Sequence, residues 1–190
     1  EPMAQKRKYL IAMPDMAAFS HKYRAAAIDM TQTYLALTNP NIERRVRMQK
    51  SGAETLYFYT EKHRMENGEK WDTERPISRK QYEKYLLERD TALSPVRKTK
   101  YRFVFADRRC EIDVYPFWRR LAVMEVELQR EDQSFTVPRG LRVLREVSGD
   151  RRLKNAALAG HVPPEEELLA EAAGNGITPL HGSPECGKII

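Results

Sequence analysis

Charged and apolar residues alternate one by one along several short stretches of this chain. Around residue 46, for example, Arg45 and Arg47 alternate with Val46 and Met48. Successive side chains of a β-strand point to opposite faces, so such a stretch forms a strand with one charged and one apolar face. The sequence therefore predicts antiparallel strands joined by turns, at residues 7–12, 27–37, 42–49, 55–62, 71–74, 96–105, 110–115 and 122–129.

Helix signals are fewer. Ser78 is followed three residues later by Gln81, which is the pattern of a capping box and predicts a helix over residues 79–88. Shorter helices are expected at 14–23, 154–159 and 165–172. A few helices outside an antiparallel sheet make an α+β fold.

The length of 190 residues suits one domain with a core of its own. We expect a domain over residues 1–160 and an acidic, Gly/Pro-rich C-terminal tail over 161–190 with one helix. The apolar runs are too short for a transmembrane segment, and no secretory signal opens the chain, so a cytoplasmic location is expected. Two cysteines cannot build a disulfide framework.

Positive charge is concentrated before residue 161. The first 160 residues hold 32 basic and 22 acidic side chains, a net charge of +10. Such an excess indicates an anionic partner, which could be nucleic acid, a lipid headgroup or a phosphorylated small molecule. No RRM-type aromatic motif, GXXG loop or zinc-finger spacing occurs, so nucleic acid is not the expected partner.

The charges segregate by strand. Two stretches are basic on their charged face and three are acidic: Arg45/Arg47, Lys98/Lys100/Arg102, Asp72/Glu74, Glu111/Asp113 and Glu125/Glu127. A half-solvated sheet with its charges in water is one explanation. A closed barrel with its charged faces inward is the other, since about eight strands can enclose one small ligand.

A triphosphate would need both kinds of charge. Arginine and lysine neutralise phosphate oxygens, arginine with paired hydrogen bonds. Paired carboxylates hold Mg²⁺ or Mn²⁺, which completes its coordination with water and substrate phosphates.

Several motifs in this order resemble the CYTH family, also called triphosphate tunnel metalloenzymes, over about residues 4–160. The matching segments are Gln32-Thr33-Tyr34-Leu35, Arg45-Val46-Arg47, the strand that ends at Lys62, the run from Lys70 to Ile77, Lys98-Thr99-Lys100, Glu111-Ile112-Asp113, Glu125-Val126-Glu127 and the segment from Glu146 to Asn155. The resemblance is strongest to CYTH-like domains associated with P-loop ATPase domains, which makes such a domain a possible partner.

The resemblance implies an eight-stranded, closed or nearly closed antiparallel β-barrel that forms a triphosphate tunnel. It implies metal-dependent hydrolysis of inorganic, nucleoside or thiamine triphosphate, with Mg²⁺ or Mn²⁺ as cofactor. The implied substrate-binding residues are Lys8, Arg45, Arg47, Lys62, Lys98, Lys100 and Arg152, the metal ligands Asp113, Glu125 and Glu127, and the catalytic residues Lys62 and Glu127.

One motif departs from the family. The family opens with ExExK, and here Ala4 and Lys6 stand where the two glutamates would be, while Lys8 keeps the lysine. Strand parity predicts that Lys6 lies near Glu125 or Glu127 and competes there with a divalent cation. The alternative function is therefore a catalytically impaired module that binds a phosphate compound, a nucleotide or a phospholipid.

Overall fold

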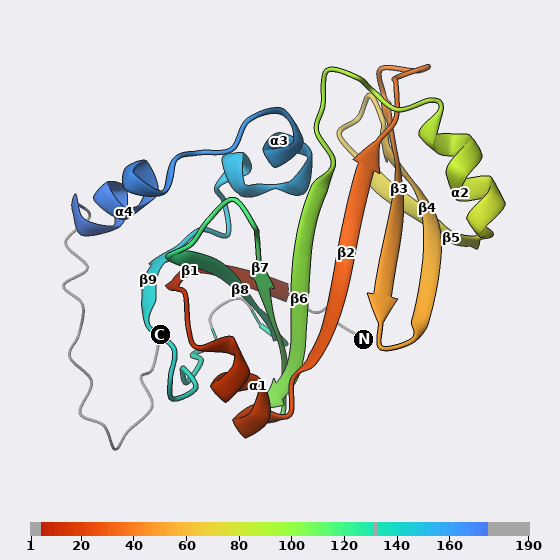
Figure 1. Cartoon of the computed structure of the whole chain (residues 1–190). Helices are drawn as coiled ribbons and strands as arrows, with labels where there is room; N and C mark the ends of the chain where they lie inside the picture. Colours follow the sequence, from red (N-terminus) through yellow and green to blue (C-terminus); the bar gives the residue numbers. More distant parts are fainter. Residues whose placement is uncertain (1–4, 131–132, 175–190) are drawn as a thin grey trace. The chain divides into compact units, whose positions relative to one another are not determined.

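The computed structural model describes residues 5–130 and 133–174, which contain nine β-strands and four α-helices (Figure 1). The chain divides into two compact units. The first unit comprises residues 1–27, 99–153 and 163–190, and the second comprises 28–98 and 154–162. All strand pairings are antiparallel, so the predicted α+β class is confirmed.

The first unit holds five strands in the order β6-β7-β8-β1-β9. Its elements are β1 (Gln5–Ala12), α1 (Met16–Tyr23), β6 (Val96–Phe105) from residue 99 onward, β7 (Arg108–Val114), β8 (Leu121–Leu128), β9 (Val143–Glu146), the 3-10 turn η1 (Arg151–Leu153) and α4 (Glu165–Gly174). The turn between β6 and β7 contains Ala106 and Asp107, both with positive φ. Such angles match the twist of a tight hairpin.

The apolar strand faces of the first unit carry its core. Helix α1 packs on this face, and the rings of Phe19 and Phe103 meet edge to face at 5.0 Å. Asp15 caps the helix by accepting a hydrogen bond from the Ala18 amide. The buried residues of this core include Tyr9, Ile11, Ile112, Met124, Val126, Leu128 and Phe135. The charged faces of the same strands therefore lie on the opposite side of the sheet.

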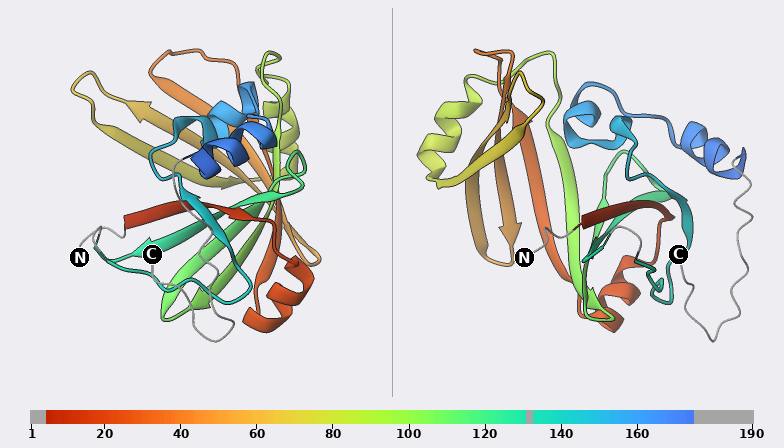
Figure 2. Two further views of the ribbon diagram at one scale, coloured as in Figure 1. Left: turned by 90° about the vertical axis from the view of Figure 1, so that its left-hand side faces the viewer. Right: turned by 180° about the vertical axis from the view of Figure 1, so that it is seen from behind.

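The second unit holds four strands in the order β5-β4-β3-β2. Its elements are β2 (Ala26–Tyr34) from residue 28 onward, β3 (Ile42–Ser51), β4 (Glu54–Arg64), β5 (Lys70–Ile77), α2 (Arg79–Leu86) and α3 (Asn155–Gly160). Figure 2 shows α2 lying across one face of this sheet, beside β4 and β5. Tyr82 of α2 packs on Tyr57, and Tyr85 stacks on Tyr59 with ring centres 4.6 Å apart.

The predicted strands and helices are all present. The capping box of Ser78 and Gln81 is confirmed, because each side chain accepts a hydrogen bond from the other residue's backbone amide. The count of eight strands was wrong, because β9 is a ninth. It has only four residues, too few to show alternation, and it forms by pairing with β1.

The strand order does not close into a ring by ladder hydrogen bonds among the described residues. The closed or nearly closed barrel therefore stays a prediction, as does the domain boundary at residue 160. Residues 1–4, including Ala4, and 175–190 of the predicted tail lie outside the described part.

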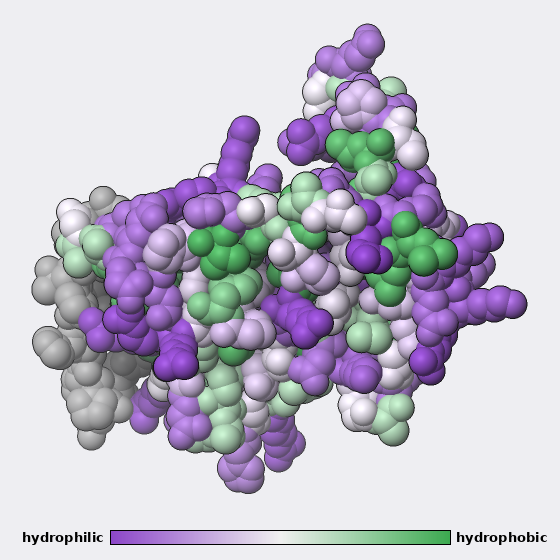
Figure 3. Space-filling view, turned by 45° about the horizontal axis from the view of Figure 1, so that its top comes forward, coloured by the Kyte–Doolittle hydropathy of each residue, from purple (hydrophilic) through white to green (hydrophobic). Residues whose placement is uncertain are grey.

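The surface is mainly hydrophilic on the side drawn in Figure 3, where apolar side chains form separate small patches. Within residues 5–130 and 133–174, no helix has the length and apolar character needed to cross a membrane. The large apolar side chains that are exposed come from separate elements, among them Leu37, Trp71, Leu87 and Val104.

Candidate functional site

The charged face of the second unit gathers three of the predicted phosphate-binding cations. Arg45 lies opposite Tyr34 of β2 and Thr60 of β4, and Arg47 lies two residues further on the same face. Lys62 follows Thr60 by two residues, so it also belongs to this face. Antiparallel register therefore assembles Arg45, Arg47 and Lys62 on one side of this sheet.

Two of these cations are not neutralised by a carboxylate. Among the described residues, neither Arg45 nor Lys62 forms an ion pair, and the buried Nε of Arg45 has no hydrogen-bond partner. The pKa of Lys62 is lowered, first by burial and then by the positive charge of Arg45, against the weaker opposing effect of Asp72. Register places Glu43 and Asp72 beside Lys62, but neither forms an ion pair with it in the described part of the chain, so Arg45 and Lys62 both lack a close carboxylate partner.

Arg47 and Lys98 have different surroundings. Arg47 forms an ion pair of 2.9 Å with Glu74, donates a hydrogen bond to Gln49 and lies 4.7 Å from the ring centre of Phe58. Lys98, the last β6 residue of this unit, is only 7% exposed. Glu74 is thus the ion-pair partner of an arginine of this face.

Gln32 is a site residue that the sequence analysis did not single out. It lies opposite Arg47 on the same face and is 4% exposed, and its Oε1 has no hydrogen-bond partner in the described part of the chain. Buried polar atoms are nearly always hydrogen-bonded, so an unpaired one beside cations marks a place for a ligand or water. Its position in the Gln32-Thr33-Tyr34-Leu35 motif was the available signal.

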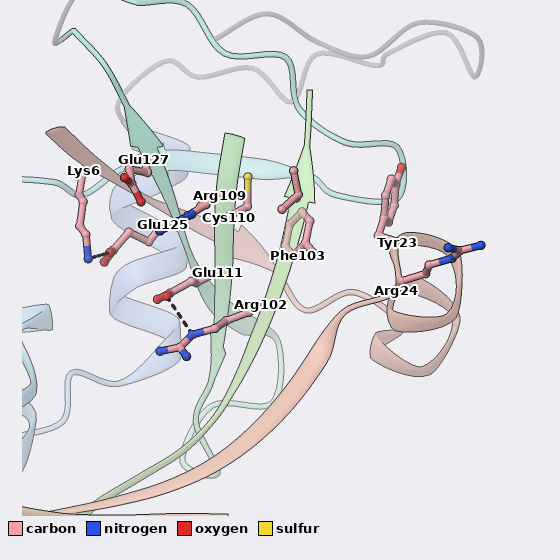
Figure 4. A pocket seen from close by; sticks show the side chains of 11 residues that line it. Lys6, Tyr23, Arg24, Arg102, Phe103, Arg109, Cys110, Glu111, Glu125 and Glu127 are labelled. Atoms are coloured by element: carbon pink, nitrogen blue, oxygen red, sulfur yellow. Dashed lines mark hydrogen bonds and ion pairs between the residues drawn. The ribbon is translucent and has the colours of Figure 1, made fainter. Parts of the chain in front are cut away.

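The charged face of the first unit carries both cations and carboxylates. Register places on it the cations Lys6, Lys8, Lys100, Arg102 and Arg109 and the carboxylates Glu111, Asp113, Glu125 and Glu127. A cavity of about 770 Å³ borders Lys6, Arg102, Glu111, Glu125 and Glu127, with Phe103 and Cys110 among its apolar lining residues (Figure 4).

The carboxylates of this face are held by lysines. Lys6 Nζ lies 3.1 Å from one oxygen of Glu125, and Lys8 Nζ lies 3.7 Å from the other. Figure 4 shows Lys6 reaching across to Glu125 rather than to Glu127, its register partner. The predicted approach of Lys6 to this acidic pair is confirmed.

Lys100 holds the second acidic pair. It contacts Glu111 and lies 3.2 Å from an oxygen of Asp113. Burial opposes the charge of Lys100, but these two carboxylates outweigh it and raise the lysine's pKa. Burial likewise raises the pKa of Glu111, but Lys100 and Arg102 outweigh that effect and lower it. Lys100, predicted to bind phosphate, is therefore already neutralised.

These residues do not fit a resident divalent cation as they stand. No group of three or more potential metal ligands comes together among the residues that the structure describes. Ammonium groups already occupy Glu111, Asp113 and Glu125. A cation such as Mg²⁺ binds by oxygen ligands and is repelled by an adjacent ammonium.

Arg152, the last predicted phosphate contact, also lies in the first unit and is held by carboxylates. Its guanidinium lies 2.8 Å from Asp150 and 2.7 Å from Glu171 of α4, and these contacts raise its pKa.

The predicted site residues are divided between the two units. Arg45, Arg47, Lys62 and Lys98 lie in the second unit, and Lys8, Lys100, Asp113, Glu125, Glu127 and Arg152 in the first.

Comparison with solved structures gives matches that include NE1496. No protein-family model matches the chain, and no curated protein matches it by sequence. Two crystal structures of NE1496 do match. One, described as the inorganic triphosphatase NE1496, is 28% identical over 85% of this chain and 97% of its own, with a TM-score of 0.57. The other, described as the hypothetical protein NE1496, is 30% identical over 85% of this chain and 100% of its own, with a TM-score of 0.56.

The match covers nearly the whole length of NE1496. The charged motifs of this sequence, which occur in the order typical of the family, agree with it. Together they show that this chain belongs to the CYTH family.

Proposed function

We propose that this protein binds a triphosphate compound through the charged face of its second unit and hydrolyses it. One observation carries the binding step: Arg45 and Lys62 lie together with no ion-pair partner in the described part of the chain. A triphosphate would bring several negative charges to these cations. The support for hydrolysis is the similarity to NE1496, which is described as an inorganic triphosphatase.

The reaction is the attack of water on a phosphorus atom, which breaks one phosphoanhydride bond. Inorganic triphosphate would give diphosphate and phosphate. Lys62 is the proposed cation on the reacting phosphates, together with Arg45 and Arg47, and Lys98 is a further candidate. Glu127 stays a candidate catalytic residue, because its carboxylate forms no ion pair within the described residues.

The predicted Mg²⁺ or Mn²⁺ cofactor stays a proposal, with Asp113, Glu125 and Glu127 as its candidate ligands. Because lysines hold two of these three carboxylates, we derive no catalytic step through a metal. The predicted P-loop ATPase partner has no support from the comparisons and stays a prediction.

Binding without hydrolysis is the second candidate, and the ion pair between Lys6 and Glu125 favours it. An internal ammonium group neutralises this carboxylate but cannot polarise a water molecule as a metal ion does. The basic face of the second unit would be unaffected by this change and would still bind phosphate.

Phosphate release distinguishes the two candidates. The purified protein would be incubated with tripolyphosphate, thiamine triphosphate and ATP, each with Mg²⁺, with Mn²⁺ or with EDTA. Release that needs the metal and is lost in Glu127→Gln supports the hydrolase. Binding without release under every condition supports the module, and neither binding nor release refutes both.

A further inference from the structure

Two arginines of the first unit converge on the acidic helix α4. Arg145 comes from β9 and Arg152 from η1, and both lie close to Asp150 and Glu171. Arg145 Nη2 lies 3.2 Å from Asp150 and 3.4 Å from Glu171. Glu167, one helical turn before Glu171, lies 3.4 Å from Arg152. Glu171 therefore sits between two guanidinium groups.

The two kinds of carboxylate in this cluster are held differently. Asp150 is fixed by the backbone, because it accepts a hydrogen bond from the Arg152 amide as well as from the Arg152 side chain. Glu171 and Glu167 come from a separate helix, and their side chains are 31% and 51% exposed. Ion pairs with such exposed partners contribute little to stability. The helix carboxylates can therefore be exchanged for another anion at small cost.

Arg145 also has an unused hydrogen-bond donor. Its Nε is buried and has no hydrogen-bond partner in the described part of the chain, although its Nη2 is occupied. An arginine whose Nε and Nη2 are both available can bind a phosphate with two parallel hydrogen bonds. The carboxylates beside Arg145 use only its Nη2.

Net charge keeps another anion out while α4 is docked. Arg145 and Arg152 face three carboxylates, those of Asp150, Glu167 and Glu171. The guanidinium of Arg152 lowers the pKa of both Asp150 and Glu171, so both stay ionised at neutral pH. Without the two helix glutamates, the two arginines would outweigh Asp150.

We infer that Arg145 and Arg152 form an anion-binding pair for a phosphate group, and that Glu171 of α4 is its exchangeable internal occupant. Glu171 then competes with the ligand, and α4 regulates binding. The inference goes beyond the proposed function, because it assigns a regulated phosphate site to residues of the first unit alone. It adds Arg145, which no motif indicated, to the residues that contact phosphate.

The test compares Glu171→Gln with Glu166→Gln by calorimetric titration with tripolyphosphate in EDTA. Both variants remove one negative charge from α4, but Glu166 pairs with Arg120 instead of Arg145 or Arg152. We expect Glu171→Gln to bind about two- to tenfold more tightly than the wild type. Glu166→Gln should bind as the wild type does.

Hydrogen exchange supplies an independent readout. Tripolyphosphate should reduce the protection of α4 backbone amides in the wild type, because it displaces the helix carboxylate from both arginines. Equal affinities of the two variants, with α4 protection unchanged on binding, would overturn the inference and leave the proposed function standing. Absence of binding by the wild type and both variants would instead overturn the proposed function, and this inference with it.

Discussion

The charged faces of the two units differ in how their charges are balanced. On the first unit Lys6, Lys8, Lys100 and Arg102 each lie close to a carboxylate, and Glu111, Asp113 and Glu125 are each held by a lysine. On the second unit Arg45 and Lys62 form no ion pair in the described part of the chain. The comparison indicates that the second unit is the one that needs an external anion.

The difference follows from which strands are neighbours. In the first unit the basic strands β1 and β6 each pair with an acidic strand, β8 and β7 respectively. In the second unit β3 lies between β2, which offers Gln32 and Tyr34, and β4, which contributes Lys62. Glu43 and Asp72 lie beside Lys62 in register but form no ion pair with it, so the second unit leaves two cations without a close carboxylate, whereas the first unit pairs its lysines with carboxylates.

The largest expected effect is the loss of binding when both unpaired cations are removed. Arg45→Gln with Lys62→Gln should weaken tripolyphosphate binding by roughly two orders of magnitude or more, because each contact is a hydrogen bond from a charged donor. Arg79→Gln is the matched control, since Arg79 is an exposed arginine of the same unit that pairs with Glu83. Equal affinities of the double variant and this control would show that Arg45 and Lys62 do not bind the phosphates.

The second prediction concerns the ion pairs of Lys100 in the first unit. Lys100→Gln leaves Glu111 and Asp113 without their shared cation and should lower the free energy of unfolding by about 2 kcal/mol at pH 7, since the group is largely but not wholly buried. Urea denaturation measures the change. Unchanged stability would mean that the lysine does not neutralise these carboxylates in solution.

The same pair has a defined pH dependence. The pKa of Glu111 is lowered on folding, so its stabilising contribution is complete above about pH 4.5 and is lost as the pH falls through the lower folded value. The pKa of Lys100 is raised, so its contribution is complete below about pH 10.5 and is lost as the pH rises through the folded value. Lys100→Gln should therefore lower the free energy of unfolding most between about pH 4.5 and about pH 10.5.

Much of this architecture could be predicted from alternation alone. The parity of residues 45–48 and 98–103 placed Arg45, Arg47, Lys98 and Lys100 on charged faces, and the structure confirms this. Lys6 near Glu125 followed from the same parity. Parity assigns a side chain to a face, but it does not say which strand lies beside it. The pairing of Lys100 with Glu111 and Asp113 was therefore missed.

The contacts of Arg145 and Arg152 could not be predicted from the sequence, for a related reason. Strand β9 is too short to show a period, so Arg145 had no assigned face. Glu171 lies 19 residues after Arg152, and the helix that carries it was predicted as part of a separate tail. Only tertiary packing brings these side chains together.

The third prediction restores the family carboxylate at position 6. Lys6→Glu would replace an ammonium by an oxygen ligand beside Glu125 and Glu127, so Mn²⁺ binding should become roughly tenfold tighter. Lys22→Glu, at an exposed lysine of α1, controls for the general change in charge. Mn²⁺ titration followed by electron paramagnetic resonance measures both, and equal affinities would show that Lys6 does not exclude a cation from this face.

The smallest expected effect is on the pH dependence of binding. Because burial and Arg45 lower the pKa of Lys62, this lysine should lose its proton, and binding should weaken, at a pH below the usual 10.5. Lys62→Arg keeps the charge throughout this range. It should remove the weakening that occurs below about pH 10.5, whereas an unchanged profile would assign the effect to another group.

Calorimetric titration of the wild-type protein with tripolyphosphate in EDTA tests the central claim most directly. If the unpaired cations of the second unit bind the phosphates, binding should be measurable without any divalent metal and should weaken steeply as salt is added. Binding that appears only after Mg²⁺ or Mn²⁺ is supplied would contradict this account, because it would assign the anion to a metal held by the acidic strands of the first unit.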